Sequence, residues 1–128
     1  MTAGRGEPLD MSNAEAICMA ALLAGAPVWR RARDGDDLVL PSLCAALAPL
    51  QLTLLAPAVD SIMTLGEACF RRRLCDGARA KDDTDLLCRL AATPTRTHEA
   101  VDGADGPVEA LICALESIRI LSHLSLHR

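Results

Sequence analysis

The chain has 128 residues, a formal net charge of -4 and 51% hydrophobic residues, which fits one folded domain and excludes a disordered tail. Alanine and leucine, 22 and 21 residues, make up a third of the sequence, whereas aromatic residues reach only 2%. This composition favours helices over sheets, which draw on β-branched and aromatic residues. The aromatic poverty and the excess of acidic over basic residues, 17 against 13, give no footprint for nucleic acid binding.

The first clear helix is predicted over residues 12–24. Ser12 opens a capping box, apolar residues then recur with helical spacing, and Pro27 lies just beyond the expected end. The preceding residues 1–11 contain glycine and proline and are predicted to be a flexible N-terminal arm. Their charge is acidic rather than basic, so we expect no secretory signal peptide. The length of the chain predicts a single helical domain over residues 12–128.

The segment 28–40 contains Asp34-Gly35, a strong signal for a two-residue turn between strands. It predicts a short β-hairpin that would have to pack on the helices, because an isolated hairpin is only marginally stable. The alternative is an extension of the first helix followed by a turn.

Residues 38–59 form a run of 22 residues without a charge, eight of them leucine, and that length would cross a bilayer. Pro41, Pro49 and Pro57 interrupt the run, and each proline ends or kinks a helix. We therefore predict two short, deeply buried segments that meet near Pro49, and no membrane span.

A long helix is predicted over residues 57–75. Its apolar residues form one stripe, and its acidic residues come early while its arginines come late, which complements the helix dipole. Gly77 lies where a C-terminal cap is expected.

A short helix follows, with Asp82, Asp83 or Asp85 as its cap and Ala92 at its end. Residues 93–106 are rich in threonine, glycine and proline and are predicted to be a loop. Pro107 then begins a last helix that runs to about Leu126.

This last helix is apolar around most of its circumference, which indicates burial on more than one side. In a domain of this size a second copy is an economical way to bury such a helix, so we predict a homodimer with an isologous interface. The alternative is a central helix inside a monomer. The residues expected to form the interface are Leu111, Leu115, Ile118, Ile120, Leu121 and Leu124.

The sequence contains no glycine-rich phosphate loop, nucleophile elbow or H-E-x-x-H motif. Glu116, His123 and His127 share one helical stripe that could hold a metal ion, although a solvated stripe at the helix end is expected instead. We therefore expect no catalytic residue, no cofactor and no metal. The alternative is a small-ligand or metal-binding protein, or an enzyme, in which these residues line a pocket with His98 and Glu99.

Six cysteines are dispersed through the chain without a C-x-x-C motif, which predicts free, buried thiols in a reducing compartment. Two arginine clusters, at 30–33 and 71–73, are predicted to be solvated helix faces or ends rather than docking sites for phosphate or acidic partners.

Together these observations predict an all-α, compact bundle of about five helices, with at most one short hairpin near 28–40. We expect a non-enzymatic protein-interaction or regulatory module. It would be homodimeric and cytoplasmic, with a further protein partner allowed and with no nucleic acid or membrane among its partners.

Overall fold

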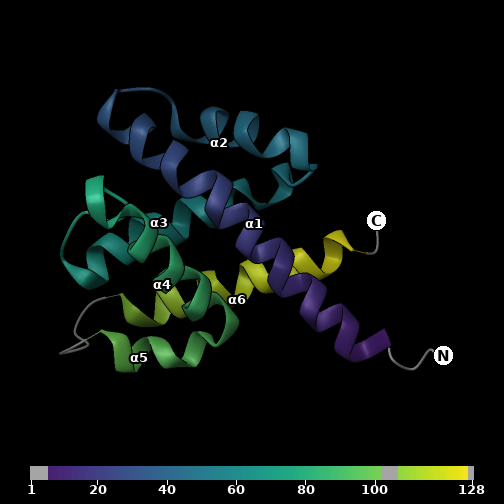
Figure 1. Cartoon of the computed structure of the whole chain (residues 1–128). Coiled ribbons are helices and arrows are strands. Elements are labelled where there is room, and N and C mark those ends of the chain that lie inside the picture. The colour runs from purple at the N-terminus through teal and green to yellow at the C-terminus, as the bar shows by residue number, and fades with distance from the viewer. Residues whose placement is uncertain (1–5, 102–106, 127–128) are drawn as a thin grey trace.

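The computed structural model describes the backbone of residues 6–101 and 107–126, with side chains from residue 13 onward. Within these ranges the chain forms six α-helices and no strand (Figure 1). The helices are α1 (Gly6–Asp34), α2 (Val39–Leu47), α3 (Ala56–Phe70), α4 (Ala80–Ala92), α5 (Thr97–Ala100) and α6 (Val108–Ser125). Short 3-10 turns lie at Ala48–Leu50, Thr53–Leu55, Gly77–Arg79 and Pro94–Arg96.

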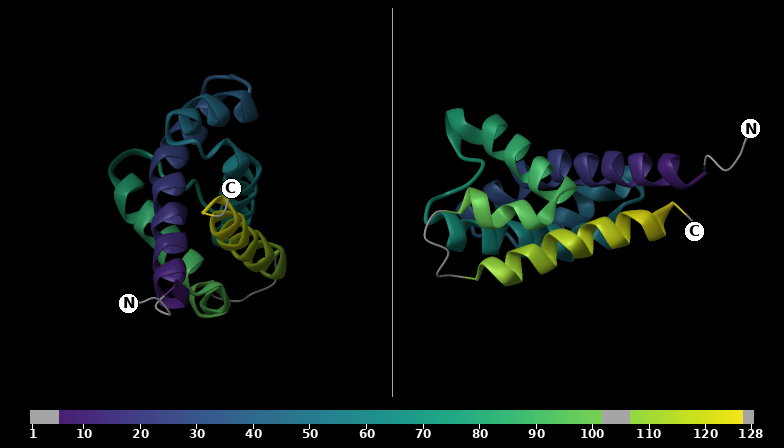
Figure 2. Two further views of the ribbon diagram at one scale, coloured as in Figure 1. Left: turned by 90° about the vertical axis from the view of Figure 1, so that its right-hand side faces the viewer. Right: turned by 90° about the horizontal axis from the view of Figure 1, so that it is seen from below.

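The bundle is organised around α1, which contacts α2, α3, α4 and α6. α6 also packs along α3, and its C-terminal end lies on the same side of the molecule as the N-terminal end of α1 (Figures 1 and 2). The all-α bundle is confirmed, with six helices among the described residues rather than five. The largest fully buried side chains include Leu22, Trp29, Leu43, Leu55, Ile62, Met63, Leu87, Leu111, Leu115 and Ile118.

The predicted hairpin at 28–40 is wrong, because α1 continues to Asp34 and α2 begins at Val39. The turn signal marks the end of a helix instead. The Gly35 N–H donates to the carbonyl of Arg31 at 2.9 Å, and Asp36 takes a left-handed backbone with φ 63°. Asp and Gly residues that favour a hairpin turn also favour the end of a helix. The structure therefore agrees with the alternative, an extension of the first helix followed by a turn.

α1 is also longer than predicted at both ends. It begins at Gly6, so residues 6–11 of the expected arm are helical, while residues 1–5 lie outside the described residues. Pro27 lies inside α1 and is exposed, and so is Leu23, whose carbonyl Pro27 leaves without its helical donor. Trp29, two residues after the proline, is completely buried. Its packing outweighs the helix stability that is lost at the proline.

The uncharged run 38–59 divides near Pro49, as predicted, into α2, a pair of 3-10 turns and the first turn of α3. Only part of it is buried: Leu43 and Leu47 are fully covered, whereas Leu38 and Leu54 are 74% and 46% exposed. No helix in the part of the chain that the structure describes is long and apolar enough to cross a membrane.

α3 ends at Phe70, five residues before the predicted boundary. Arg71, rather than Gly77, takes the left-handed position after the helix, with φ 58°. Gly77 instead begins a 3-10 turn that leads into α4. The chain between these two residues leaves the helix because its backbone and its arginines are held by acidic side chains of α1, α3 and α4, as described below.

α4 and α6 lie close to their predicted positions. The predicted loop 93–106 is partly helical, because Pro94 starts a 3-10 turn that runs into the single-turn α5. Residues 102–106 lie outside the described residues.

Candidate functional site

α6 has one face in the core and another at the surface. Leu111, Leu115 and Ile118 are completely buried against the chain's own helices. Ile120 and Leu124 are 60% and 53% exposed. Leu121, the remaining residue of the predicted interface, is half-buried. The structure therefore leaves the outer side of α6, and not its whole circumference, available to a partner.

The outer side carries an uncharged line of residues that we call the α6 ridge. Its members alternate three and four residues apart and are all exposed: Ala110, Cys113, Ser117, Ile120 and Leu124. At 100° per residue the ridge lies opposite the buried leucines, and its spacing is that of a helix-pairing seam. Figure 2 (right) shows α6 along one edge of the molecule, with no described helix beyond it.

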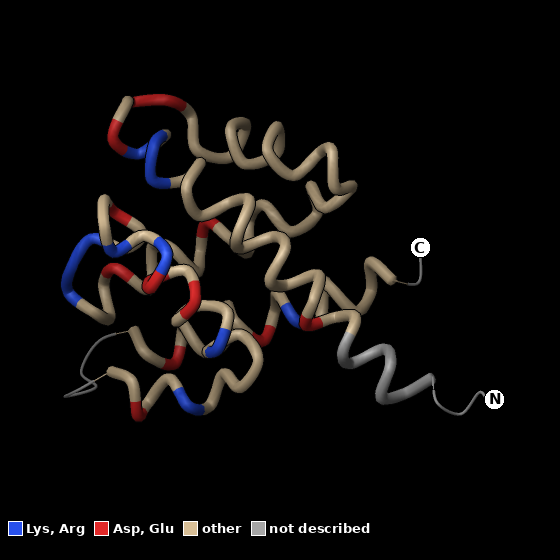
Figure 3. The backbone as a smooth tube through the Cα atoms, viewed as in Figure 1, with Lys and Arg blue, Asp and Glu red and all other residues tan. Residues whose placement is uncertain are grey.

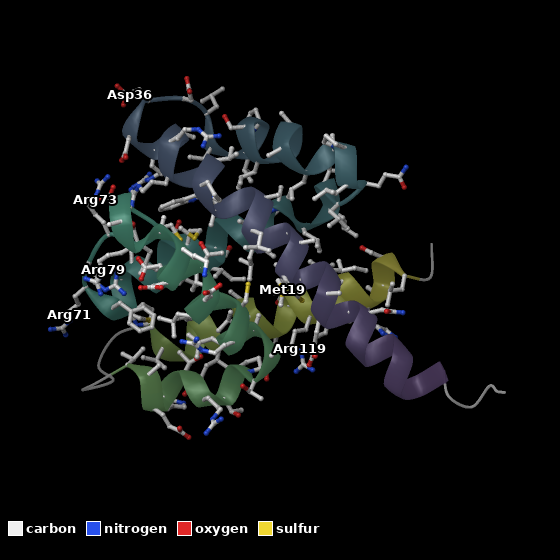
Figure 4. All side chains as sticks on the ribbon, in the orientation of Figure 1. Met19, Asp36, Arg71, Arg73, Arg79 and Arg119 are labelled. Atoms are coloured by element: carbon white, nitrogen blue, oxygen red, sulfur yellow. The ribbon has the colours of Figure 1, made fainter. Side chains whose placement is uncertain are left out.

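One flank of the ridge borders a hollow between α1 and α6. The hollow has a volume of about 580 Å³ and is lined by Ala14, Glu116, Arg119, Ile120, His123 and Leu124. Arg119 lies near the crossing of the two helices (Figure 4). The flank thus brings one acidic and two basic side chains beside the two exposed apolar residues of the ridge.

The structure separates the polar residues that the alternative interpretation placed in one metal or ligand site. His98 faces Glu109 at the start of α6, with His98 Nε2 and Glu109 Oε2 2.8 Å apart. His123 lies near the other end of the same helix, and 14 residues of α-helix span roughly 21 Å. His127 lies outside the described residues, and among those described no three metal-ligating side chains come together.

Glu99 does not join His123 or Glu116 either. It is exposed on α5, where Arg96 Nε lies 3.7 Å from its Oε1. Of the four described residues expected to line one pocket, Glu116 and His123 lie beside the hollow, whereas His98 and Glu99 pair with other side chains away from it.

A second polar cluster lies where α1, α3 and α4 meet the chain between α3 and α4. We call it the polar junction: Arg30, Glu67, Arg72, Asp83 and the backbone of Leu74 and Cys75. Arg30 is 8% exposed and donates to Glu67 and, at 3.3 Å, to the carbonyl of Leu74. Glu67 also accepts from the Leu74 N–H at 2.9 Å.

Arg72 and Asp83 form the other half of the junction. Two guanidinium nitrogens of Arg72 donate to the two oxygens of Asp83, at 3.0 and 2.8 Å. The Cys75 N–H donates to the same carboxylate at 2.9 Å, and Cys75 has a left-handed backbone with φ 59°. Hydrogen bonds from Arg72 hold the pKa of Asp83 below its usual range, although burial acts in the opposite direction.

Trp29 ties the junction to the core. Its Nε1 donates to Asp60 Oδ1 at 2.7 Å, and the guanidinium carbons of Arg30 and Arg33 lie 5.1 and 5.6 Å from the ring centroid. The prediction that both arginine clusters are simply solvated is therefore wrong for Arg30 and Arg72, which hold helices together.

The six cysteines are all free. Cys18, Cys69 and Cys75 are buried, Cys44 and Cys88 are half-buried, and Cys113 on the α6 ridge is exposed. Burial raises the pKa of each of the three buried thiols, and burial together with the nearby Asp85 raises the pKa of Cys88 to about 11. Such thiols stay protonated and weakly nucleophilic at neutral pH.

Charge is distributed unevenly over the molecule. α2 and the turns after it carry none, while charged residues gather around the junction and on α4 and α5 (Figure 3). Arg71, Arg73 and Arg79 lie together at the α3–α4 connection, well away from Arg119 (Figure 4). Arg73 is itself paired, with Asp34 at 2.8 Å and Asp76 at 2.9 Å.

Sequence reasoning missed the junction and the ridge as units. The carboxylates that bind Arg30 and Arg72 lie 37 and 11 residues away along the chain, and no short motif connects them. The ridge did carry a signal, the alternating three- and four-residue spacing of uncharged residues. Small side chains at three of its five positions hid that signal from a search for large apolar residues.

Comparison with known proteins adds no relative, because no family model, curated protein or solved structure matches this chain.

Proposed function

We propose that this chain is a non-enzymatic interaction module that acts as a homodimer, with its two subunits in contact along the α6 ridge. The observation that carries the proposal is the exposure of Ile120 and Leu124, 60% and 53%, on a line of the helix that has no charge over four turns. Single exposed apolar side chains are ordinary, but a continuous uncharged helical seam is typical of a surface that another helix covers.

The use of the charged side chains supports a structural rather than a catalytic role. Arg30, Glu67, Arg72 and Asp83 direct their hydrogen bonds to one another and to the backbone of the α3–α4 connection. A catalytic acid or base instead needs a free lone pair or proton aimed at a substrate. We therefore assign this cluster to fold stability and the interaction itself to the α6 ridge.

The hollow beside the ridge favours a second candidate, the binding of a small amphipathic ligand. Its volume of about 580 Å³ falls within the range of ligand pockets, and Arg119 and His123 would face an acidic group. A dimer that covers Ile120 and Leu124 would fill or close this hollow, so dimerisation and ligand binding there should compete.

The free cysteines support a reducing location such as the cytoplasm.

The test compares substitutions of two similarly exposed apolar residues by light scattering after size exclusion. Ile120→Glu places a charge on the ridge, while Leu23→Glu places one on α1, where Leu23 is 51% exposed beside α4. We expect the wild type and Leu23→Glu to elute as dimers and Ile120→Glu to elute as a monomer, with unchanged helical circular dichroism in all three. A wild type that is monomeric at 100 μM, taken as roughly the range of weak specific association, contradicts the proposal.

A further inference from the structure

We propose that the two copies of α6 pair antiparallel, about a two-fold axis that passes between Ser117 and Ile120. This inference rests on the homodimer proposed above and specifies how the second copy lies on the ridge. It follows from the order of side-chain sizes and charges along the exposed face of α6.

The ridge changes in size along its length. Ala110, Cys113 and Ser117 in its first part are small, whereas Ile120 and Leu124 in its second part are large. Two identical helices of this kind fit when the large end of one lies on the small end of the other. A parallel pair would place each large residue on its own copy and leave the small ends facing each other across a gap.

Helix-pairing geometry and the order of side-chain sizes together define the register of the antiparallel pair. Alternate positions of a seam pack in layers, so Ile120 lies against the partner's Ser117, and Leu124 lies against the partner's Cys113. Each of the two kinds of layer occurs twice because of the two-fold axis, and every one combines a small and a large side chain. The interface is therefore isologous and closed, and it produces a dimer rather than a filament.

The charges beside the ridge agree with the same register. In the antiparallel pair the flank that carries Glu116 meets the same flank of the partner, and Glu116 comes within about 3 Å, along the helix axis, of the level of the partner's His123. A parallel pair would instead set Glu116 beside the partner's Leu121. A carboxylate and a basic side chain at the edge of an apolar seam favour the arrangement that brings them together.

The antiparallel register determines the distance between the two Cys113 residues of a dimer. Cys113 lies level with position 124 of the partner, about 16 Å along the helix from the partner's Cys113. Disulfide formation needs Cα atoms within about 7 Å, so the wild-type pair should not cross-link through Cys113. A thiol introduced by Leu124→Cys would lie against the partner's Cys113 and should cross-link.

The experiment oxidises three proteins with copper phenanthroline and reads dimer formation on a non-reducing gel. We expect Leu124→Cys to form at least tenfold more cross-linked dimer than either the wild type or the double variant Cys113→Ser/Leu124→Cys. Sedimentation of the reduced proteins under the same conditions reports whether each is a dimer before oxidation.

The outcomes separate this inference from the homodimer itself. Efficient cross-linking of the wild type, or of the double variant, indicates a parallel pair and overturns the antiparallel register. A reduced Leu124→Cys protein that sediments as a dimer but does not cross-link overturns it as well. Sedimentation of the reduced wild type as a monomer overturns the homodimer, and the inference with it.

Discussion

The polar junction and the α6 ridge differ in how they place charged and apolar side chains: the junction buries charges, and the ridge exposes apolar residues. The junction takes charged residues from α1, α3, α4 and the α3–α4 connection and pairs them with one another, while Arg30 and Asp83 are only 8% and 3% exposed. The ridge takes uncharged residues of one helix and leaves them in solvent, with Ile120 60% exposed. Charge inside and apolar surface outside reverse the usual arrangement, and the difference separates the part that holds the fold from the part that remains to be covered.

The largest expected effect is the loss of the Asp83 carboxylate. Asp83→Ala removes the carboxylate that accepts from Arg72 and from the Cys75 N–H, which leaves the Cys75 N–H without its acceptor and Arg72 with only the carbonyl of Arg73. We expect the free energy of unfolding to fall by about 2–4 kcal/mol in urea titrations, with the dimer affinity of the folded protein unchanged. Arg73→Ala is the control, because its partners are exposed and its removal should change stability little. Equal losses in the two variants would contradict the distinction between buried and exposed pairs.

Gly66→Ala should disturb the same region through packing. A Cβ at this position would lie 2.8 Å from Cδ1 of Leu74, whose backbone is held by Glu67 and Arg30 and cannot easily move away. Overpacking of this kind costs about 1–3 kcal/mol, measurable as a lower urea midpoint with an unchanged slope. Wild-type stability in this variant would show that the loop is held more loosely than its hydrogen bonds indicate.

The ridge should behave in the reverse manner. Ile120→Ala removes a side chain that the monomer leaves 60% exposed, so the stability of the monomer should change by no more than about 0.5 kcal/mol. The dimer dissociation constant should rise by about tenfold, since a central apolar contact contributes about 1.4 kcal/mol or more. Isothermal dilution calorimetry measures the second quantity. A large loss of folding stability would place Ile120 in the core instead.

Acid should act on the junction through Asp83. Because the folded-state pKa of Asp83 is lowered, its contribution to stability is fully present above the unfolded value of about 3.9 and disappears as the pH falls through the folded value. We therefore expect the unfolding free energy to decline as the pH falls below about 4. In Asp83→Asn this part of the decline should be missing, and an identical pH profile in the two proteins would exclude Asp83 as its source.

Thiol labelling gives the smallest but most local signal. At neutral pH Cys113 should react first with a maleimide, because it is exposed, and Cys88 should react slowly, because burial raises its pKa to about 11. If the ridge is the dimer interface, the rate at Cys113 should also fall as protein concentration rises. A rate at Cys113 that is independent of concentration in a confirmed dimer would move the interface elsewhere.

The sequence predicted what local chemistry determines. The division of the chain at Pro49 follows from proline chemistry, and α4 and α6 follow from helical periodicity with acidic and proline starts. The hairpin failed because Asp34-Gly35 is a turn signal that also ends helices, and the burial of Trp29 decided between the two.

The site was harder to predict, because it depends on which side of α6 the core occupies. Leu111 and Ile120 are equally apolar in the sequence, yet the first is fully buried and the second is 60% exposed. Only the positions of α1 and α3 against α6 distinguish them. Likewise, Arg30 and Arg72 differ from a solvated arginine only through carboxylates brought to them by other helices.

Sedimentation equilibrium of the wild-type chain tests the central claim most directly. Across protein concentrations from about 1 to 100 μM, taken as the range for specific but reversible association, the mass should rise from that of the 13.6 kDa chain to twice that value and then stop. A plateau at the dimer is the result that a closed, two-fold α6 pair predicts. A single 13.6 kDa species throughout, or a mass that continues to grow beyond the dimer, would contradict it.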